Sequence, residues 1–451
     1  LPHLAVTLST CGNSCSVLTA NGILMKEGVL IQPTVQTEPR TRLDAIDLLR
    51  GLVMVIMALD HVRDYFHNAS FKVDPVDLQH TTPALFFTRW ITHFCAPTFV
   101  FLAGAGAFLA GTRGKSKGQL SWFLLTRGLW LVLFEATFVR LSWNFHLDYA
   151  REFGGGVFFA IGWSMAILSL LVFLPARVVA LIGVALVGLH NLLDGLIAEQ
   201  VGLPKFLWMV LHSPDRLEIF PGGKLGPFTV PQLHFVTGYS ILPWLGVMAS
   251  GYGFGALFLL ERSRRRREFL KIGLLLCALF VIVRAINIYG DLTPATSAPV
   301  TGTSPGPWKA QDKPLFTLLS FLNCHKYPPS LVFLLMTLGP AILALAVFDR
   351  EPGRVSRFFI TFGRVPLFYY LLHIPLIHGL VVAADYVRYG SSPYAAEAPW
   401  TIGGRQLPPD YGYDLPVVYA VWLGVVLALY PLCRWYAGVK QRSRSAWLSY
   451  L

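Results

Sequence analysis

The stretch RLDAIDLLRGLVMVIMALDHVRDYFH, residues 42–67, joins a long apolar run to titratable side chains at both of its ends. Its part 45–66 is close to the ~20 residues that a helix needs to cross a bilayer. Backbone amides in lipid must find their hydrogen-bond partners within the segment, so we expect a helix. Ionisable side chains in such a helix are costly and are functional candidates by default. The stretch therefore predicts a transmembrane helix that carries a site.

The composition of the whole chain supports a membrane protein. Apolar residues make up 54 % of the 451 residues and charged residues only 14 %, whereas a soluble domain carries about 25 % charged residues. The net charge of +12 could suggest a nucleic-acid partner. We do not expect one, because the basic residues lie in short loops between apolar runs, as membrane topology requires. The expected partner of the surface is the lipid bilayer.

Ten apolar segments have the length of a membrane span, which predicts an all-α, polytopic integral membrane protein. The segments are 45–66, 83–111, 121–145, 156–174, 177–197, 234–260, 269–290, 328–348, 359–383 and 415–436. The connections between them are short or rich in proline and glycine. We expect a disordered N-terminal tail over 1–40, one transmembrane domain over 41–437 and a basic cytoplasmic tail over 438–451.

The distribution of Lys and Arg predicts the orientation. If the N-terminus is cytoplasmic, the inner segments carry 19 Lys and Arg in 57 residues and the outer segments carry 10 in 130 residues. This asymmetry follows the positive-inside rule. It predicts that both termini are cytoplasmic, and we expect a bacterial inner membrane.

Helix geometry relates the polar residues of the first span. Arg50 and His61 are eleven residues apart, so both lie on one face, separated by ~16 Å along the axis. Asp64 follows His61 by three residues and His67 follows Asp64 by three, so neighbours in this series can touch. A carboxylate beside an imidazole is the arrangement of a general base. The series, with Asp60, predicts a catalytic group; alternatively, Asp60, Arg63, Asp64 and His67 only pair at the membrane interface.

Further polar residues lie in other spans. His93 in the second span is expected at the depth of His61 and can face the same cavity or pack as a structural histidine. Trp143 and Asn144, near the outer end of the third span, could bind a sugar ring. His373 and His378 do not share a face, and Cys11 and Cys15 have no second cysteine pair, so we expect no metal site.

Five stretches in chain order resemble the heparan-α-glucosaminide N-acetyltransferase catalytic family and its bacterial relatives in the transmembrane acyltransferase superfamily. They are LDAIDLLRG (43–51), APTFVFLAGAGAFL (96–109), LPWLGVMASGYGFG (242–255), YPPSLVFLLMTLG (327–339) and FGRVPLFYYLLHIPL (362–376). The spacing of Arg50 and His61 is also similar to the opening of acyltransferase family 3.

The resemblance implies an enzyme that takes an acyl group, expected to be acetyl, from cytoplasmic acetyl-CoA. The acceptor would be a hydroxyl or amine of a glycan or other molecule on the far side of the membrane. The acyl-carrying histidine of the family lies in a His-Ala-Ser context, and His67-Asn68-Ala69-Ser70 is the nearest match here. Covalent transfer through that histidine and direct transfer with His61 as base both remain open.

Basic residues at the inner face could hold the phosphates of CoA. The candidates are Arg50, Arg113, Lys115 and Arg127. Two alternative hypotheses involve no acyl transfer. One is a transporter or flippase for a glycan or a lipid-linked intermediate, and the other is a scaffold whose polar residues only join helices. The sequence also allows a homodimer.

Overall fold

The computed structural model describes residues 24–26, 29–31, 43–70, 72–147, 152–213, 215–225, 228–230, 232–291, 306–392, 408 and 410–443. The chain divides into two compact units, Leu1–Leu43 and Asp44–Leu451. In the first unit, strand β1 (Leu24–Lys26) pairs antiparallel with β2 (Val29–Ile31). The rest of the predicted disordered tail lies outside the described residues, as does most of the predicted C-terminal tail.

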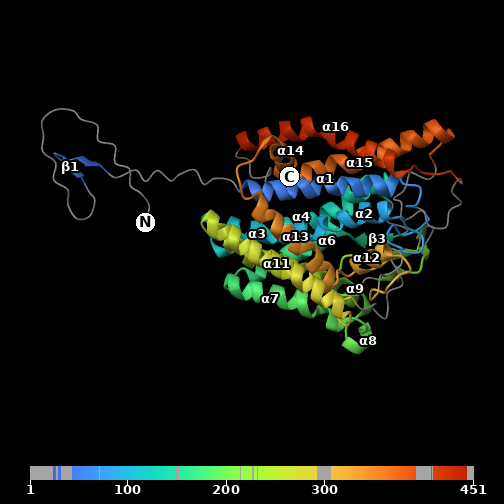
Figure 1. Cartoon of the computed structure of the whole chain (residues 1–451), viewed down its shortest axis with the longest axis horizontal. Helices are drawn as coiled ribbons and strands as arrows, with labels where there is room; N and C mark the ends of the chain where they lie inside the picture. Colours follow the sequence, from blue (N-terminus) through green and yellow to red (C-terminus); the bar gives the residue numbers. More distant parts are fainter. Residues whose placement is uncertain are drawn as a thin grey trace. The chain divides into compact units, whose positions relative to one another are not determined.

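The second unit is a bundle of helices (Figure 1). Its first half contains α1 (Asp44–Phe66), α2 (Pro83–Thr92), α3 (Cys95–Gly111), α4 (Lys117–Phe134), the π-helix η1 (Glu135–Val139), α5 (Arg140–Asn144), α6 (Val157–Leu171), α7 (Ala176–Leu189) and the 3₁₀ helix η2 (His190–Leu193). Its second half contains α8 (Ala198–Val201), α9 (Lys205–Leu211), α10 (Ile241–Phe254), the 3₁₀ helix η3 (Gly255–Leu259), α11 (Arg262–Ile286), α12 (Pro314–Leu322), α13 (Leu331–Phe348), α14 (Arg354–Arg364), α15 (Pro366–Tyr389) and α16 (Leu415–Arg442).

The helices confirm a multi-pass, all-α membrane protein. Eight helical segments of the described chain are long and apolar enough to cross a bilayer, and the shorter α6 is also apolar. Together with α1, which is more polar, these eight segments and α6 correspond to the ten predicted spans. The ninth predicted span, 359–383, is wrong at its start, because the chain breaks between α14 and α15 at Val365. Pro366 opens α15 there, and proline is tolerated in the first turn of a helix but not in its interior.

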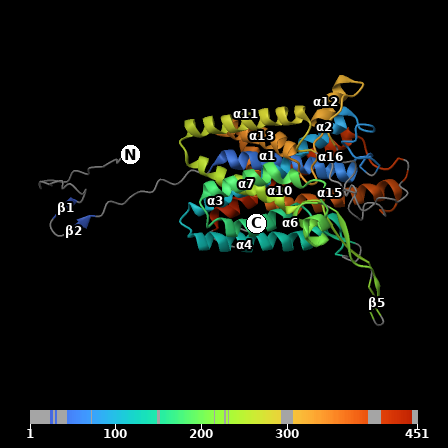
Figure 2. The same cartoon turned by 90° about the horizontal axis from the view of Figure 1, so that it is seen from below.

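Small β-structures lie among the connections on the side that the sequence predicts to be outside. Strand β7 (Leu233–Thr237) pairs parallel with β3 (Glu152–Gly155) and antiparallel with β4 (Arg216–Phe220). Strands β5 (Gly223–Leu225) and β6 (Phe228–Val230) form a hairpin that projects from the helices (Figure 2). The first residues of the predicted span 234–260 are therefore strand, not helix.

Helix α1 runs through the middle of the bundle, between α14, α15 and α16 on one side and α13 and α3 on the other (Figure 1). Its closest neighbour is α14, and glycine permits that approach. A side chain at Gly51 would overlap the carbonyl of Phe359, and one at Gly363 would overlap the carbonyl of Asp47. Small residues allow helix backbones to pack this closely in membranes.

Replacing Gly363 by valine should lower the free energy of unfolding by about 3 kcal/mol, because α14 must move away from α1. Thermal unfolding of the purified protein in detergent measures this effect. Gly424 in α16 has nothing within 4 Å of the position of a side chain, so Gly424→Val is the matched control. Equal melting temperatures for the two variants would contradict the close crossing.

Candidate active site

Two arginines bind the carboxylate of Asp60 within the bundle. The Nη2 atom of Arg63 lies 2.8 Å from Oδ1 of Asp60 and 2.6 Å from Oδ1 of Asp64. Nη1 of Arg89 on α2 lies 2.5 Å from Oδ2 of Asp60. Arg63 is only 2 % exposed, and its two ion pairs agree with the alternative that these residues pair at the end of the helix. Arg89 is a partner that the sequence alone did not indicate.

His61 points into the bundle, where it meets a histidine of α15. Its Nδ1 lies 2.7 Å from Nε2 of His373, and the two rings stack with centroids 5.0 Å apart. This is the one hydrogen bond of His61 within the described residues. Asp64, the expected partner, instead accepts from Arg63. The carboxylate–imidazole pair predicted for His61 is therefore replaced by a histidine–histidine pair.

The hydrogen bonds of His373 assign the protons of the pair. Its Nδ1 lies 3.0 Å and 3.1 Å from the carbonyl oxygens of Tyr369 and Tyr370. Carbonyls only accept, so Nδ1 of His373 carries the proton and its Nε2 must accept from Nδ1 of His61. The lone pair of neutral His61 is then on Nε2. That atom has no hydrogen-bond partner within the described residues and is not among their enclosed polar atoms, since the side chain is half-buried.

Trp143 on α5 fixes the imidazole from another side. The ring of His61 meets the ring of Trp143 edge-on, with centroids 4.9 Å apart. Nε1 of Trp143 lies 3.5 Å from the hydroxyl of Tyr370. The backbone carbonyl of Trp143 accepts a hydrogen bond from the hydroxyl of Tyr65 at 2.7 Å. Trp143 is only 8 % exposed. Its position fits support of His61 better than the sugar stacking expected from the sequence.

The π-helix η1 explains how Trp143 reaches His61. A π-helical turn rotates the residues that follow it relative to a continuous α-helix, and such turns often mark functional sites. Glu135, the first residue of η1, accepts a hydrogen bond from the backbone N–H of Phe158 at 2.9 Å and so joins this turn to α6. Asn144, the other predicted sugar ligand, donates to the carbonyl of Arg140 in its own helix.

A second polar group faces the same region from the loop between α12 and α13. The ammonium of Lys326 lies 5.1 Å from the ring of Tyr327 and interacts electrostatically with Asp60 and His61. The ring of Tyr239 packs edge-on against Tyr327, with centroids 5.3 Å apart. His93 is buried, interacts electrostatically with Lys326, and has no hydrogen-bond partner at Nδ1. This places His93 near the group.

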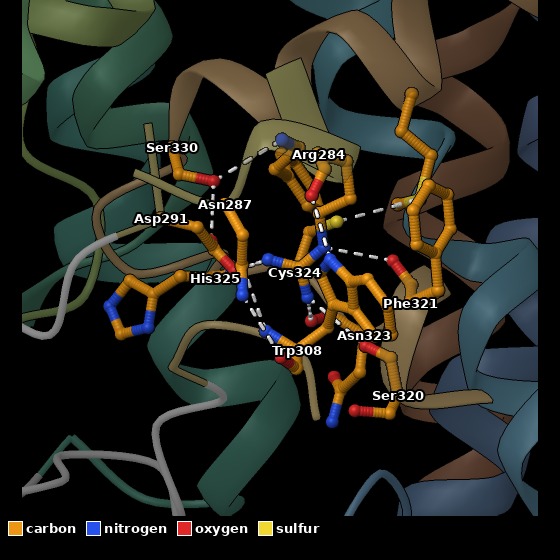
Figure 3. A network of polar contacts seen from close by, with 12 residues as sticks. Arg284, Asn287, Asp291, Trp308, Ser320, Phe321, Asn323, Cys324, His325 and Ser330 are labelled. Carbon is orange, nitrogen blue, oxygen red and sulfur yellow. Dashed lines mark hydrogen bonds and ion pairs between the residues drawn. The ribbon is translucent and has the colours of Figure 1, made fainter. Parts of the chain in front are cut away.

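Figure 3 shows what holds the loop that carries Lys326. Arg284 on α11 is paired with Asp291 and donates to the carbonyls of Ser320, Phe321 and Asn323. Oδ1 of Asp291 accepts from the backbone N–H of His325 at 2.8 Å and from the hydroxyl of Ser330 at 2.9 Å. The residues on both sides of Lys326 are therefore fixed to one buried ion pair.

Residues 42–289 match the model of a family described as heparan-alpha-glucosaminide N-acetyltransferase, catalytic. The chain belongs to this family. No curated protein matches the chain. Membership indicates a membrane acetyltransferase and confirms the resemblance noted in the sequence.

In this member of the heparan-α-glucosaminide N-acetyltransferase catalytic family, the site joins the matched region to the rest of the chain. The match covers α1 to α11 and includes His61, Arg89 and Trp143. His373 and Lys326 follow the matched region in the sequence. In the sequence, the one signal for His373 is that it is a titratable residue in an apolar helix. Nothing in the sequence connects it with His61.

The predicted CoA-binding residues of this family member lie in two places. Arg50 lies on α1 against α14, with Nη1 3.5 Å from Oδ1 of Asp47 and from the carbonyl of Gly363. Lys115 and Arg127 lie 5.4 Å and 5.8 Å from the ring of Phe123 on α4. Arg113 is exposed in the turn between α3 and α4. All four are at the end of the bundle that the sequence predicts to be cytoplasmic.

His67 has a structural environment at the outer end of α1. Its Nδ1 accepts from the backbone N–H of Ala69 at 3.1 Å, and the residue is 6 % exposed. Burial lowers the pKa of His67, and nearby Arg63 lowers it further. The neighbouring Asn68 donates its backbone N–H to the carbonyl of Tyr413. His67 thus helps to attach the end of α1 to the segment that leads into α16.

The family implies an acetyl-CoA donor. Within the described residues, no three His, Cys, Asp or Glu side chains gather as a metal site. The arrangement around His61 offers a nitrogen lone pair, whose direction is fixed by His373 and Trp143. This is what general-base chemistry requires.

Proposed function

We propose that the protein transfers an acetyl group from cytoplasmic acetyl-CoA to a hydroxyl or amine of a glycan or other acceptor on the far side of the membrane, with His61 as the general base. The observation that carries this proposal is the unpartnered Nε2 of His61 within the described residues, with a tautomer that is set by His373. A fixed lone pair of this kind can take a proton from a hydroxyl or amine. Transport or scaffolding would not require it.

His61 alone can accept and return the proton of the proposed reaction. Nε2 accepts the proton of the acceptor while the acceptor oxygen or nitrogen attacks the thioester carbon. The bond between the acyl carbon and sulfur then breaks, and the imidazolium returns the proton to the CoA thiolate. Nδ1 of His61 keeps its hydrogen bond to Nε2 of His373 throughout. His373 therefore acts as a positioning residue.

The donor would bind from the inner end of α1. Arg50 and His61 lie ~16 Å apart along this helix, so the flexible arm of CoA could extend from phosphates near Arg50 to a thioester near His61. Arg113, Lys115 and Arg127 are further candidates for phosphate contacts. The acceptor would enter from the outer end, where Asp60, Asp64 and Lys326 lie.

Release of free CoA thiol by the purified protein tests the proposal. We expect acetyl-CoA to be consumed faster when glycan acceptors are added, and labelled acetyl to appear in one of them. In proteoliposomes, movement of a labelled glycan across the membrane without release of thiol would instead support a transporter or flippase.

His373→Ala should lower kcat about 100-fold while the KM for acetyl-CoA stays unchanged, because His61 loses the acceptor that sets its tautomer. His373→Gln should recover part of kcat, since its amide oxygen can accept from Nδ1 of His61. Steady-state kinetics with both substrates varied measures the two constants. A similar loss in both variants would indicate that His373 only fills space.

A further inference from the structure

His93 is the one buried histidine of the described residues whose side chain makes no hydrogen bond there. It is 3 % exposed, and its Nδ1 is enclosed without a partner. Every other buried histidine in the described part of the chain has a side-chain hydrogen bond: His67, His190, His212, His325, His373 and His378. Buried polar groups normally have partners, so this imidazole is a candidate for binding a ligand.

Two contacts between α2–α3 and α1 place His93 along the first helix. Arg89, which precedes His93 by four residues and therefore shares its face of α2, binds Asp60. The Sγ atom of Cys95, two residues after His93, donates to the carbonyl of Val53 at 3.3 Å. Asp60 and Val53 are seven residues, or about two turns, apart and so share one face of α1. His93 lies beside α1 between these two levels.

This level lies between the two ends of the proposed donor path. Arg50 is three residues closer than Val53 to the inner end of α1, and His61 directly follows Asp60. His93 is therefore about one helical turn closer than His61 to the inner end. An arm of CoA that extends from Arg50 to a thioester near His61 would pass His93 just before it reaches the general base.

The two ring nitrogens of His93 have different surroundings. Nδ1 is enclosed, whereas Nε2 has no hydrogen bond within the described residues and is not among their enclosed polar atoms. An enclosed N–H without an acceptor is rarer than an unmet lone pair, so the proton belongs on Nε2. Burial and the positive charges of Arg89 and Lys326 disfavour an imidazolium. His93 thus presents one N–H of a neutral imidazole on its open side.

We propose that the Nε2–H of His93 binds the carbonyl oxygen of the donor thioester and stabilises the negative charge that develops there during transfer. This inference rests on the proposed function. A neutral imidazole can serve as such a donor, and donors aimed at a developing oxyanion are a large source of catalysis.

The electrons and protons of this step balance without a change in the protonation of His93. As the acceptor attacks, the π electron pair of the carbonyl moves to its oxygen, where the Nε2–H of His93 donates to it. The pair returns to the carbon when the bond between carbon and sulfur breaks. His61 accepts the proton of the acceptor and returns it to the thiolate, so the two histidines have separate roles.

Binding of two CoA derivatives tests the hydrogen bond without turnover. Acetyl-CoA and S-ethyl-CoA differ in the carbonyl oxygen, and their affinities for the full-length protein in detergent can be compared by calorimetry without an acceptor. We expect acetyl-CoA to bind about tenfold more tightly, because S-ethyl-CoA leaves the N–H of His93 unpaired. His93→Leu should abolish this preference, and His93→Gln should keep it, since its amide also donates. Equal binding to the wild type, or a preference that survives in His93→Leu, would overturn the proposal.

Thermal unfolding distinguishes this role from a structural one. Because His93 makes no side-chain hydrogen bond within the described residues, His93→Leu should melt at or above the temperature of the wild type. His212 is the matched control, since it is equally buried and its Nε2 lies 3.1 Å from Oδ1 of Asp194. His212→Leu should melt at a lower temperature. An equal loss of stability in the two leucine variants would show a structural role for His93 and contradict the proposal.

Kinetics separate the donor from the acceptor as the source of the bound oxygen. In the acceptor-dependent release of thiol, His93→Leu should lower kcat about 10²- to 10³-fold, and His93→Gln should recover part of it. A raised KM for the acceptor with unchanged kcat would assign His93 to the acceptor and reject the proposal. If no acceptor is acetylated but the preference for acetyl-CoA still depends on His93, the proposed function fails and the carbonyl site stands.

Discussion

Replacing His61 by alanine should lower kcat for acetyl transfer by about 10²- to 10⁴-fold, the usual contribution of a general base. The variant loses the one ring nitrogen of the pair that makes no hydrogen bond within the described residues, while His373 keeps its own hydrogen bonds to the carbonyls of Tyr369 and Tyr370. The KM for acetyl-CoA should stay close to that of the wild type. Thiol release and transfer of labelled acetyl both measure the effect.

Two histidines serve as controls for this result. The side chain of His80 is 57 % exposed and pairs with Asp77 outside the bundle, so His80→Ala should be fully active. His67→Ala distinguishes direct from covalent transfer. If His67 carries the acyl group, this variant should be inactive and should trap no labelled acetyl group. Unchanged turnover in His61→Ala, together with loss in His67→Ala, would reject His61 as the base.

Replacing Arg284 by leucine should lower the free energy of unfolding by about 3–5 kcal/mol. The guanidinium is 1 % exposed and neutralises Asp291, which is 5 % exposed; a buried charge that loses its partner costs this much. The variant also leaves the carbonyls of Ser320 and Asn323 without their donor. Thermal unfolding in detergent measures the loss.

Arg264 lies on the same helix and is exposed, so Arg264→Leu should unfold at the temperature of the wild type.

The pH dependence of the stability of Arg284→Leu provides a second test. Burial raises the pKa of Asp291 and Arg284 opposes that effect. Without Arg284 the carboxyl favours its protonated form in the folded state, so the stability deficit should shrink as pH falls and grow as pH rises. A deficit that is independent of pH would contradict an unpaired carboxylate as its cause.

The sequence predicted much of the membrane fold because hydrophobicity and length decide which segments cross a bilayer. The failures lie where the backbone departs from a continuous helix. Pro366 separates α14 from α15, and strand β3 pairs with β7, which follows it by about eighty residues. A connection rich in proline and glycine gives no signal for such a distant parallel pair, whose partner can be found only by folding the chain.

The site was predictable only within one helix. Helical spacing correctly placed Asp60 and His61 in the densest polar region, but it also suggested Asp64 as the partner of His61. The structure shows that Asp64 accepts from Arg63 and that His61 turns to His373, 312 residues away. Residues three or four apart can be paired from sequence; residues brought together by tertiary packing, including Arg89 and Lys326, cannot.

The protonation of His61 tests the central claim most directly. NMR of the protein with ¹⁵N-labelled histidine, assigned by comparison with His61→Gln, reports which ring nitrogen carries the proton. The account predicts a neutral His61 with the proton on Nδ1, shared with His373, and a bare Nε2. A proton on Nε2 would contradict it, because no lone pair would then be available to the acceptor.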